Sequence, residues 1–272
     1  MNLNLKQIKA VVIDMDGVLW RGETTLPGFN QFFDMLYSRN ISFMLATNNA
    51  RKTPDQHIAR FAGFGVTINR KHVMTSSLAT AAHLQNELPI GAKVYVVGED
   101  GIRNALNEVG LTIVDDSSQP VNAVISGLDM SLSYQKLKDA TILIRQGARY
   151  VATNGDLTYP IEQGFAPGAG AIMAAIQAAT DVEPTVIGKP GRLMFDIAMQ
   201  KMGSIPSQTM MIGDRLETDI LGGQRAGLKT LLVTSGVDNE QSIAAKGIKP
   251  DMIMSGIAEL VEVWRPSRNF VP

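Results

Sequence analysis

Two carboxylates, Asp14 and Asp16, come directly after an apolar run at residues 10–13 and just before Gly17. A short β-branched run bounded by polar residues is typical of a buried strand in a parallel sheet. Ligands bind at the carboxyl ends of such strands, and alternate side chains of a strand point to the same side. Two carboxylates this close repel each other unless a cation or a shared proton separates them. The pattern therefore indicates a Mg²⁺ site, or an acid in which one Asp is kept protonated.

The same residues have two other interpretations. A turn without a chemical role explains Asp16 and Gly17 equally well, because Asp and Gly are common in turns after strands. A calcium-binding loop of the EF-hand kind fits less well, because it has Gly at its sixth position and follows a helix rather than a strand. The polar residues elsewhere in the chain decide between these interpretations.

Polar residues also occur at other predicted strand ends and helix starts. Thr47 and Asn48 follow an apolar strand, and Lys189 lies in a Gly-Lys-Pro turn before a helix. Asp214 follows another strand, with Asp219 five residues later. Taken singly, such residues are explained as helix caps or solvated charges. Taken together, they supply the groups that bind a phosphoryl group and a hard cation.

Strand and helix patterns alternate along the chain, which predicts an α/β fold with parallel sheets. The pattern restarts at Lys93, and the segment from Asn154 to Pro167 is predicted to be a loop. The predicted strands are 10–13, 41–46, 73–75, 94–97, 111–114, 123–126, 150–153, 184–187, 209–212, 230–233 and 252–254, and the predicted helices are 28–38, 53–63, 77–88, 100–109, 134–146, 170–180, 193–202, 218–226 and 257–264.

Composition places the chain among ordinary globular proteins. Its 272 residues suit one large or two modest domains, and 45% are hydrophobic against 19% charged. A net charge of −1 gives no attraction toward nucleic acid or an anionic membrane. The absence of cysteine excludes disulfides and thiolate metal sites. Neither a signal peptide nor a run of about 18 apolar residues is seen, so a cytoplasmic protein is expected.

Four motifs, in order, resemble those of the haloacid dehalogenase-like hydrolase superfamily, in its NagD-like, p-nitrophenyl-phosphatase-type branch. They are DMDGV at 14–18, ATNN at 46–49, GKP at 188–190 and GDRLETD at 213–219, with further likeness at 151–157 and 167–171. The resemblance implies a Rossmann-like parallel-sheet core with an inserted α/β cap of class IIA. The implied core is residues 1–82 and 183–272, and the implied cap is 83–182.

The resemblance also implies roles for the polar residues. Asp14 would be the nucleophile that forms an aspartyl-phosphate, and Asp16 the general acid and then the base for water. Mg²⁺ would be held by the Asp14 side chain, the backbone carbonyl of Asp16 and Asp214. Asp219 would support the water molecules of the metal as a more distant neighbour.

The phosphoryl oxygens would be bound by Thr47, the amide of Asn48 and Lys189. Such a transition state needs little beyond alignment and charge neutralisation. Arg215 has two interpretations, since it would either approach the substrate or pair with Glu217.

The expected function is a Mg²⁺-dependent phosphatase that hydrolyses a small phosphorylated metabolite. A nucleotide, a sugar phosphate and a three-carbon phosphate all remain candidates, as do a monomer and a homodimer. Two alternatives are a non-enzymatic binding module and a dehalogenase, which has no use for Asp16 or a metal. The expected specificity loop lies in the cap and carries Asn154, Asp156, Tyr159 and Glu162.

Overall fold

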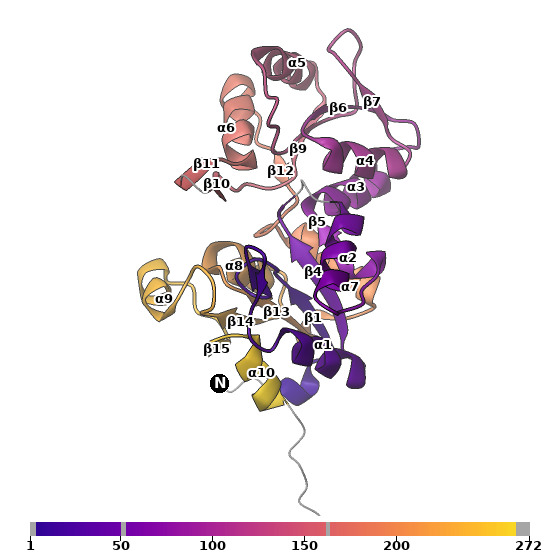
Figure 1. Cartoon of the computed structure of the whole chain (residues 1–272). Helices are drawn as coiled ribbons and strands as arrows, with labels where there is room; N and C mark the ends of the chain where they lie inside the picture. The colour runs from indigo at the N-terminus through magenta and orange to yellow at the C-terminus, as the bar shows by residue number, and fades with distance from the viewer. Residues whose placement is uncertain (1–3, 50–52, 162–163, 265–272) are drawn as a thin grey trace, which may run out of the picture. The chain divides into compact units, whose positions relative to one another are not determined.

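The computed structural model describes residues 4–49, 53–161 and 164–264, and the chain divides into two compact units (Figure 1). The boundaries of the expected core and cap stay predictions, and the two units are described separately. The first unit comprises 1–46, 57–73 and 198–272, and the second comprises 47–56 and 74–197.

The first unit is built on a six-stranded sheet in the order β15-β14-β13-β1-β4-β5. In β1, every residue is buried, as expected for a central strand whose two faces are both covered. β1 pairs in parallel with β13 on one side and with β4 on the other. The strands are β1 (Ala10–Ile13), β4 (Ser42–Thr47), β5 (Val73–Thr75), β13 (Thr209–Gly213), β14 (Lys229–Val233) and β15 (Met252–Met254).

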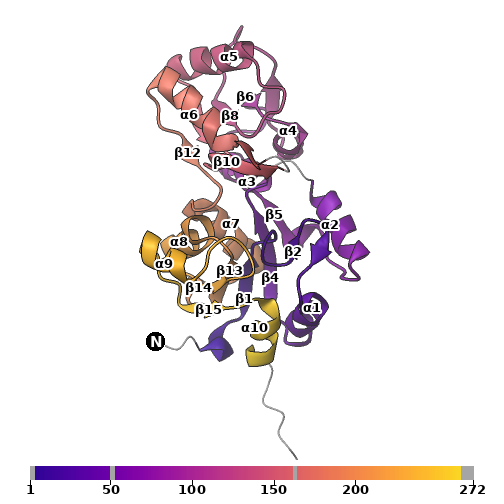
Figure 2. The same ribbon diagram turned by 60° about the vertical axis from the view of Figure 1, so that its left-hand side comes forward.

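Helices and a short hairpin cover this sheet. Helices α1 and α10 pack against each other and lie side by side in Figure 2. Trp20, Phe29, Phe33 and Phe61 form an aromatic cluster within the hydrophobic core of this unit. The elements are β2 (Trp20–Arg21), β3 (Thr24–Thr25), α1 (Phe29–Ser38), α2 (Pro54–Gly63), a π-helical turn (Leu216–Ile220), α8 (Leu221–Arg225), α9 (Glu240–Lys246) and α10 (Ile257–Trp264), with 3₁₀ turns at Leu5–Gln7, Arg70–His72 and Pro206–Gln208.

The second unit has its own parallel sheet of five strands, in the order β12-β9-β8-β6-β7. Strand β12 pairs with β9, a few residues beyond the predicted cap boundary at 182. Helix α7 (Arg192–Met202) crosses from the second unit into the first. The other elements are α3 (Ser76–Glu87), β6 (Lys93–Val97), α4 (Asp100–Glu108), β7 (Thr112–Val114), β8 (Ala123–Ser126), α5 (Tyr134–Arg145), β9 (Arg149–Ala152), β10 (Thr158–Ile161), β11 (Gly164–Pro167), α6 (Ala169–Thr180) and β12 (Thr185–Val186).

One predicted segment is wrong: the expected loop at 154–167 contains the antiparallel hairpin β10–β11. The hairpin pairs Tyr159 with Ala166 and stands apart from the five-stranded sheet. Its sequence gives no strand signal, because Pro160 lies inside the first strand and Gly164 begins the second. A two-stranded pair of this kind tolerates Pro, since each strand has a free edge.

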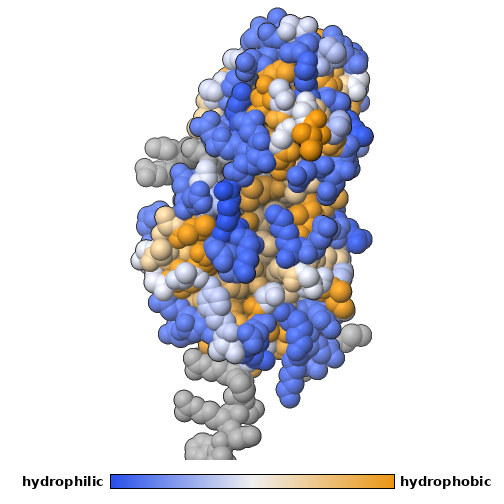
Figure 3. Space-filling view, turned by 90° about the vertical axis from the view of Figure 1, so that its right-hand side faces the viewer, coloured by the Kyte–Doolittle hydropathy of each residue, from blue (hydrophilic) through white to orange (hydrophobic). Residues whose placement is uncertain are grey.

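The predicted α/β class, with parallel sheets and covering helices, is confirmed. On the face drawn in Figure 3, patches of hydrophobic residues alternate with larger hydrophilic areas. Among the described residues, no helix combines the length and the apolar character needed to cross a membrane.

Candidate active site

Three carboxylates come together in the first unit at the carboxyl ends of adjacent strands. Ile13 of β1 is in register with Ile212 of β13, so that Asp14 and Asp214 follow neighbouring strands. The backbone N–H of Asp14 donates to the Ile212 carbonyl at 2.9 Å and continues the ladder. Oxygens of Asp14, Asp214 and Asp219 lie within 4.8 Å of one another. Parallel pairing therefore brings together residues that are 200 positions apart in the chain.

Three glycines make room for these carboxylates. A Cβ on Gly17 or Gly236 would lie only 2.4 Å or 1.9 Å from Asp214 Oδ2. A Cβ on Gly213 would lie 2.2 Å from the Asp219 Cβ. Distances below 3.0 Å require the neighbouring atoms to move, so only glycine fits where the backbone approaches these carboxylates so closely.

Backbone N–H groups fix the orientation of two of the carboxylates. Asp214 Oδ2 accepts a hydrogen bond from Val237 N at 2.9 Å, and Asp219 Oδ2 accepts one from Arg215 N at 3.1 Å. Asp214 and Asp219 are almost fully buried, with exposed fractions of 2% and 1%. Three carboxylates at this spacing repel one another unless a cation lies among them. An all-oxygen donor set fits a hard divalent cation such as Mg²⁺.

Sequence reasoning missed Asp238, which supports the loop after β13. Its buried side chain accepts from Leu216 N at 2.8 Å and from Lys246 Nζ at 3.0 Å. Burial raises the pKa of Asp238, but these hydrogen bonds outweigh burial and hold the pKa below its usual value. Glu217 pairs with Lys246 at 2.8 Å, rather than with Arg215 as one interpretation of Arg215 required. No motif marks Asp238, because the backbone N–H that it binds, that of Leu216, lies 22 positions earlier.

Asp16 stands apart from the three-carboxylate group. It is exposed, and its Oδ1 accepts a hydrogen bond from the indole Nε1 of Trp20 at 2.9 Å. Among the described residues, the metal-competent group contains the side chain of Asp219 and not that of Asp16. The expected metal ligand of Asp16 is its backbone carbonyl, and this stays a prediction. The Asp16 carboxyl group is therefore held by the indole of Trp20 and lies outside the metal-competent group.

The predicted phosphate-binding residues belong to the second unit, which begins with Thr47, the last residue of β4. The Asn48 side chain clasps the backbone of Lys189: Lys189 N donates to Asn48 Oδ1, and Asn48 Nδ2 donates to the Lys189 carbonyl, both at 2.8 Å. Lys189 is buried, with 2% exposed, and Thr47 is 5% exposed. A Cβ on Gly188 would lie 2.6 Å from Asn48 Oδ1, so this close contact depends on glycine. The structure thus brings Asn48 and Lys189 together.

Two residues of the expected specificity loop reinforce this clasp. Asn154 Nδ2 donates to the Asn48 carbonyl at 3.0 Å, and the Asp156 carboxylate accepts from Asn48 Nδ2 at 3.2 Å. Tyr159 lies on β10, where its hydroxyl donates to Met130 Sδ at 3.4 Å. Glu162 lies outside the described residues.

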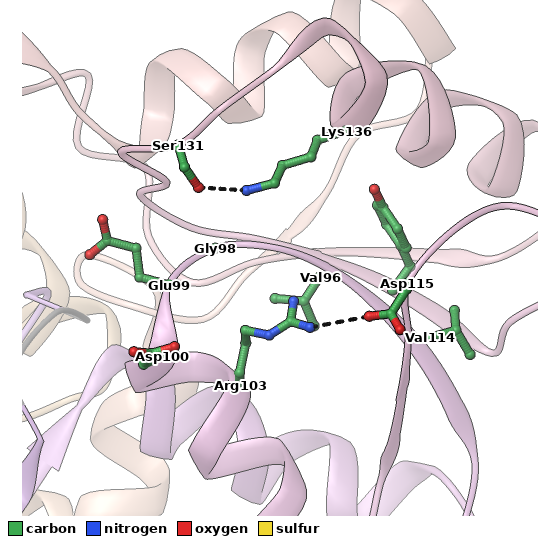
Figure 4. Close-up of a pocket in the computed structure, with 10 residues that line it drawn as sticks. Val96, Gly98, Glu99, Asp100, Arg103, Val114, Asp115, Ser131 and Lys136 are labelled. Carbon is green, nitrogen blue, oxygen red and sulfur yellow. Dashed lines mark hydrogen bonds and ion pairs between the residues drawn. The ribbon is translucent and has the colours of Figure 1, made fainter.

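A cavity of about 580 Å³ in the second unit lies at the carboxyl ends of β6 and β7 (Figure 4). Lys136 Nζ pairs with Asp129 at 2.7 Å and with Ser131 Oγ at 2.8 Å. Arg103 pairs with Asp115 at 3.7 Å. The two lining cations are therefore paired, Arg103 with Asp115 of the lining and Lys136 with the neighbouring Asp129. The lining residues are Tyr95, Val96, Gly98, Glu99, Asp100, Arg103, Val114, Asp115, Ser131 and Lys136, and the predicted site residues are not among them.

Known proteins resemble this chain along almost its whole length. The 5'-nucleotidase YutF of Bacillus subtilis is 35% identical over 257 residues, which cover 94% of this chain and 99% of that protein. The acid sugar phosphatase of Staphylococcus aureus is 36% identical over 257 residues, which cover 94% and 98%. The solved structure of NagD from Escherichia coli K-12 superposes with a TM-score of 0.85 at 34% identity, covering 93% of this chain and 98% of that one.

Two family models match the sequence. Residues 11–112 match the model for haloacid dehalogenase-like hydrolases, and residues 186–260 match a second, HAD-hydrolase-like model. The first match includes Asp14, Thr47 and Asn48, and the second includes Lys189 and Asp214. The predicted family and enzyme class are confirmed: the chain belongs to the haloacid dehalogenase-like hydrolases, in their NagD-like branch of phosphoric monoester hydrolases.

Proposed function

We propose that the protein hydrolyses a small-molecule phosphomonoester in a Mg²⁺-dependent reaction, through an aspartyl-phosphate on Asp14. The observation that carries the proposal is the group of Asp14, Asp214 and Asp219, with oxygens within 4.8 Å at the ends of adjacent strands. A dehalogenase has no need of such a cation site, and a simple binding module has no need of a nucleophile within it.

The metal would be held by the carboxylates of Asp14 and Asp214 and by the backbone carbonyl of Asp16. When bound, Mg²⁺ neutralises charge, so that a carboxylate and an anionic phosphoryl group approach each other. Asp219, oriented by the N–H of Arg215, would hold the water molecules of the metal. The buried Asp214 would keep its place through its bond from Val237 N.

In the first step, an oxygen of Asp14 attacks phosphorus, a new P–O bond forms, and the ester P–O bond breaks. Asp16 gives its proton to the leaving oxygen. In the second step, Asp16 takes a proton from water, which attacks phosphorus and releases phosphate and free Asp14. Thr47, the amide of Asn48 and Lys189 would bind the phosphoryl oxygens, because a transition state of this kind requires neutralisation of its equatorial oxygens.

The proposed substrates are nucleotides, sugar phosphates or three-carbon phosphates, and the names of the relatives support the first two. Asn154 and Asp156 both bond to Asn48, which supports a scaffolding role for them. Tyr159 and Glu162 stay candidates to meet the leaving group, the alternative being that they only face solvent. A cytoplasmic location and a monomeric or homodimeric state stay predictions.

The test is phosphate release from p-nitrophenyl phosphate and from a panel of phosphomonoesters, with Mg²⁺ and with excess EDTA. The proposal expects turnover that EDTA abolishes and Mg²⁺ restores. Absence of phosphate release from every ester would favour a binding module. Halide release from a haloacid that persists in EDTA would favour a dehalogenase. Unchanged phosphate release in EDTA would remove the metal from the mechanism.

A further inference from the structure

Trp20 makes a specific contact with Asp16. The indole N–H of Trp20 donates to Asp16 Oδ1 at 2.9 Å, and the Asp16 side chain has no second hydrogen bond within the described part of the chain. The two residues differ sharply in exposure, because Asp16 lies at the surface while Trp20 is 1% exposed. A buried, rigid donor therefore holds one oxygen of an exposed carboxyl group.

We propose that Trp20 is a positioning residue for Asp16, and that its indole N–H selects Asp16 Oδ2 as the oxygen that carries and transfers the proton. This inference rests on the proposed acid–base role of Asp16. The indole N–H is a donor only, so it neither gives up its proton nor accepts one. An aspartic acid whose carbonyl oxygen accepts this bond must carry its proton on the other oxygen. The bond is retained when Asp16 is ionised, so the carboxyl group keeps one orientation through both steps of the reaction.

The backbone fixes the spacing between the two residues. The backbones of Asp16 and Trp20 form a single parallel β-bridge, in which Gly17 N donates to the Trp20 carbonyl at 2.8 Å. Leu19 N donates to the Met15 carbonyl at 2.8 Å and closes the turn. Gly17 has a φ of +83°, which suits glycine and few other residues. The turn after β1 therefore returns the chain so that Trp20 meets Asp16.

Aromatic packing fixes the indole ring. The Trp20 ring meets Phe61 edge-on with centroids 5.3 Å apart, and it also contacts Phe64 at 6.0 Å and Phe29 at 6.4 Å. Edge-to-face contacts of this kind hold rings in defined orientations. Because the ring does not turn, the direction of its N–H is constant, and so is the position of the oxygen that it binds.

A cation covers the face of the same ring. The guanidinium carbon of Arg60 lies 4.2 Å from the centroid of the Trp20 ring, and Arg60 also donates to the Gly22 carbonyl. A cation over an indole face is attracted to its π electrons. It also draws electron density from the ring, which makes the N–H a stronger donor, as in other polarised networks. Arg60 thus contributes to both the direction and the strength of the bond to Asp16.

The matched control is Trp264, the second tryptophan of the first unit. Trp264 is 3% exposed, its Nε1 donates to the Leu5 carbonyl at 3.0 Å, and Arg39 lies over its ring at 5.4 Å. Replacing either Trp by Phe keeps an aromatic ring and removes one indole hydrogen bond. A loss of stability alone should therefore appear in both variants, whereas a loss of positioning should appear in one.

The experiment compares W20F, W264F, D16N and wild type by pre-steady-state kinetics. One substrate is p-nitrophenyl phosphate, whose leaving group needs little protonation, and the other is the alkyl phosphomonoester that wild type hydrolyses fastest. In W20F we expect the alkyl phosphorylation rate to fall about tenfold or more, with the p-nitrophenyl burst nearly unchanged. Because dephosphorylation also needs Asp16, W20F should accumulate phosphoenzyme, detected by intact mass. W264F should match wild type in both readouts.

The outcomes separate the inference from the proposed function. If D16N depends on the leaving group as wild type does, the acid–base role of Asp16 fails, and the role of Trp20 fails with it. If D16N shows the stronger dependence while W20F behaves as W264F does, the positioning role alone is refuted. An equal fall for both substrates in W20F would also refute it, because that result indicates general damage to the site.

Discussion

Gly236→Ala should disable the metal site without removing any of its ligands. An added Cβ would lie 1.9 Å from Asp214 Oδ2 and 2.3 Å from the Asp214 Cβ. Ordinary contact begins at 3.4 Å, so the distance is too short by 3.4 less 1.9, or about 1.5 Å. Asp214 cannot move by this amount and keep its bond from Val237 N. A misplacement of about 1 Å at a reacting centre costs roughly a hundredfold in rate.

We therefore expect Gly236→Ala to lower kcat about a hundredfold and to weaken Mg²⁺ binding. The control is Gly63→Ala in α2 of the same unit, where a Cβ meets nothing within 4 Å. That substitution should leave kcat unchanged and stabilise the helix by up to about 1 kcal/mol. Steady-state rates over a Mg²⁺ series, calorimetric Mg²⁺ binding and thermal unfolding measure all three quantities. Wild-type Mg²⁺ affinity and rate in Gly236→Ala would refute the assigned geometry of Asp214.

Three further predictions concern the metal, the Asn48 clasp and the second unit. Ca²⁺ should bind to the EDTA-treated protein but inhibit it, because Ca²⁺ prefers more ligands and a looser geometry than Mg²⁺; full turnover with Ca²⁺ would contradict this. Asn48→Ala removes both bonds that hold the Lys189 backbone, so kcat/KM should fall at least about tenfold while Mg²⁺ affinity is kept, and an unchanged kcat/KM would count against the clasp. Burial raises the pKa of Asp129, but hydrogen bonds from Lys136 and Ser131 lower the pKa by more than burial raises it. The pKa therefore lies below its usual value. The ionised Asp129 carboxylate therefore stabilises the fold above about pH 4, and this stabilisation is lost as the pH falls through the folded-state pKa of Asp129. In urea unfolding, Asp129→Asn should cost about 1–3 kcal/mol at pH 7 and progressively less as the pH falls below 4, whereas a constant difference would refute the assignment.

The positions of the candidate site residues Asp14 and Asp214 could be predicted because these residues follow strands. An apolar run followed by polar residues marks the carboxyl end of a buried strand, and parallel pairing of β1 with β13 then brings Asp14 to Asp214. The alternation of strand and helix patterns along the chain predicted the α/β class, because strands that alternate with helices form parallel sheets. Asn48 and Lys189 were predicted by resemblance and lie together in the structure.

Contacts between side chains distant in sequence could not be predicted in this way. The supporting role expected of Asp219 stays a prediction, but its place beside Asp14 and Asp214 depends on the π-helical turn Leu216–Ile220, which brings the three carboxylates within 4.8 Å of one another. A regular helix was predicted there, since no local signal distinguishes a wide turn from an α-helical one. Asp238 likewise binds a backbone N–H more than twenty residues away. In the sequence, Trp20 cannot be distinguished from other core aromatic residues, and only the structure shows that its N–H binds Asp16.

The central claim is that Asp14 carries the phosphoryl group during turnover. Asp16→Asn should keep the attacking carboxylate and the backbone carbonyl of residue 16, but it lacks the base for water. Mixed with p-nitrophenyl phosphate and Mg²⁺, this variant should release about one p-nitrophenolate per site in a burst. Intact-mass and peptide analysis should then locate one phosphoryl group on Asp14, and Asp14→Asn should give neither burst nor adduct. A phosphoryl group on another residue, or turnover by Asp14→Asn, would contradict the account.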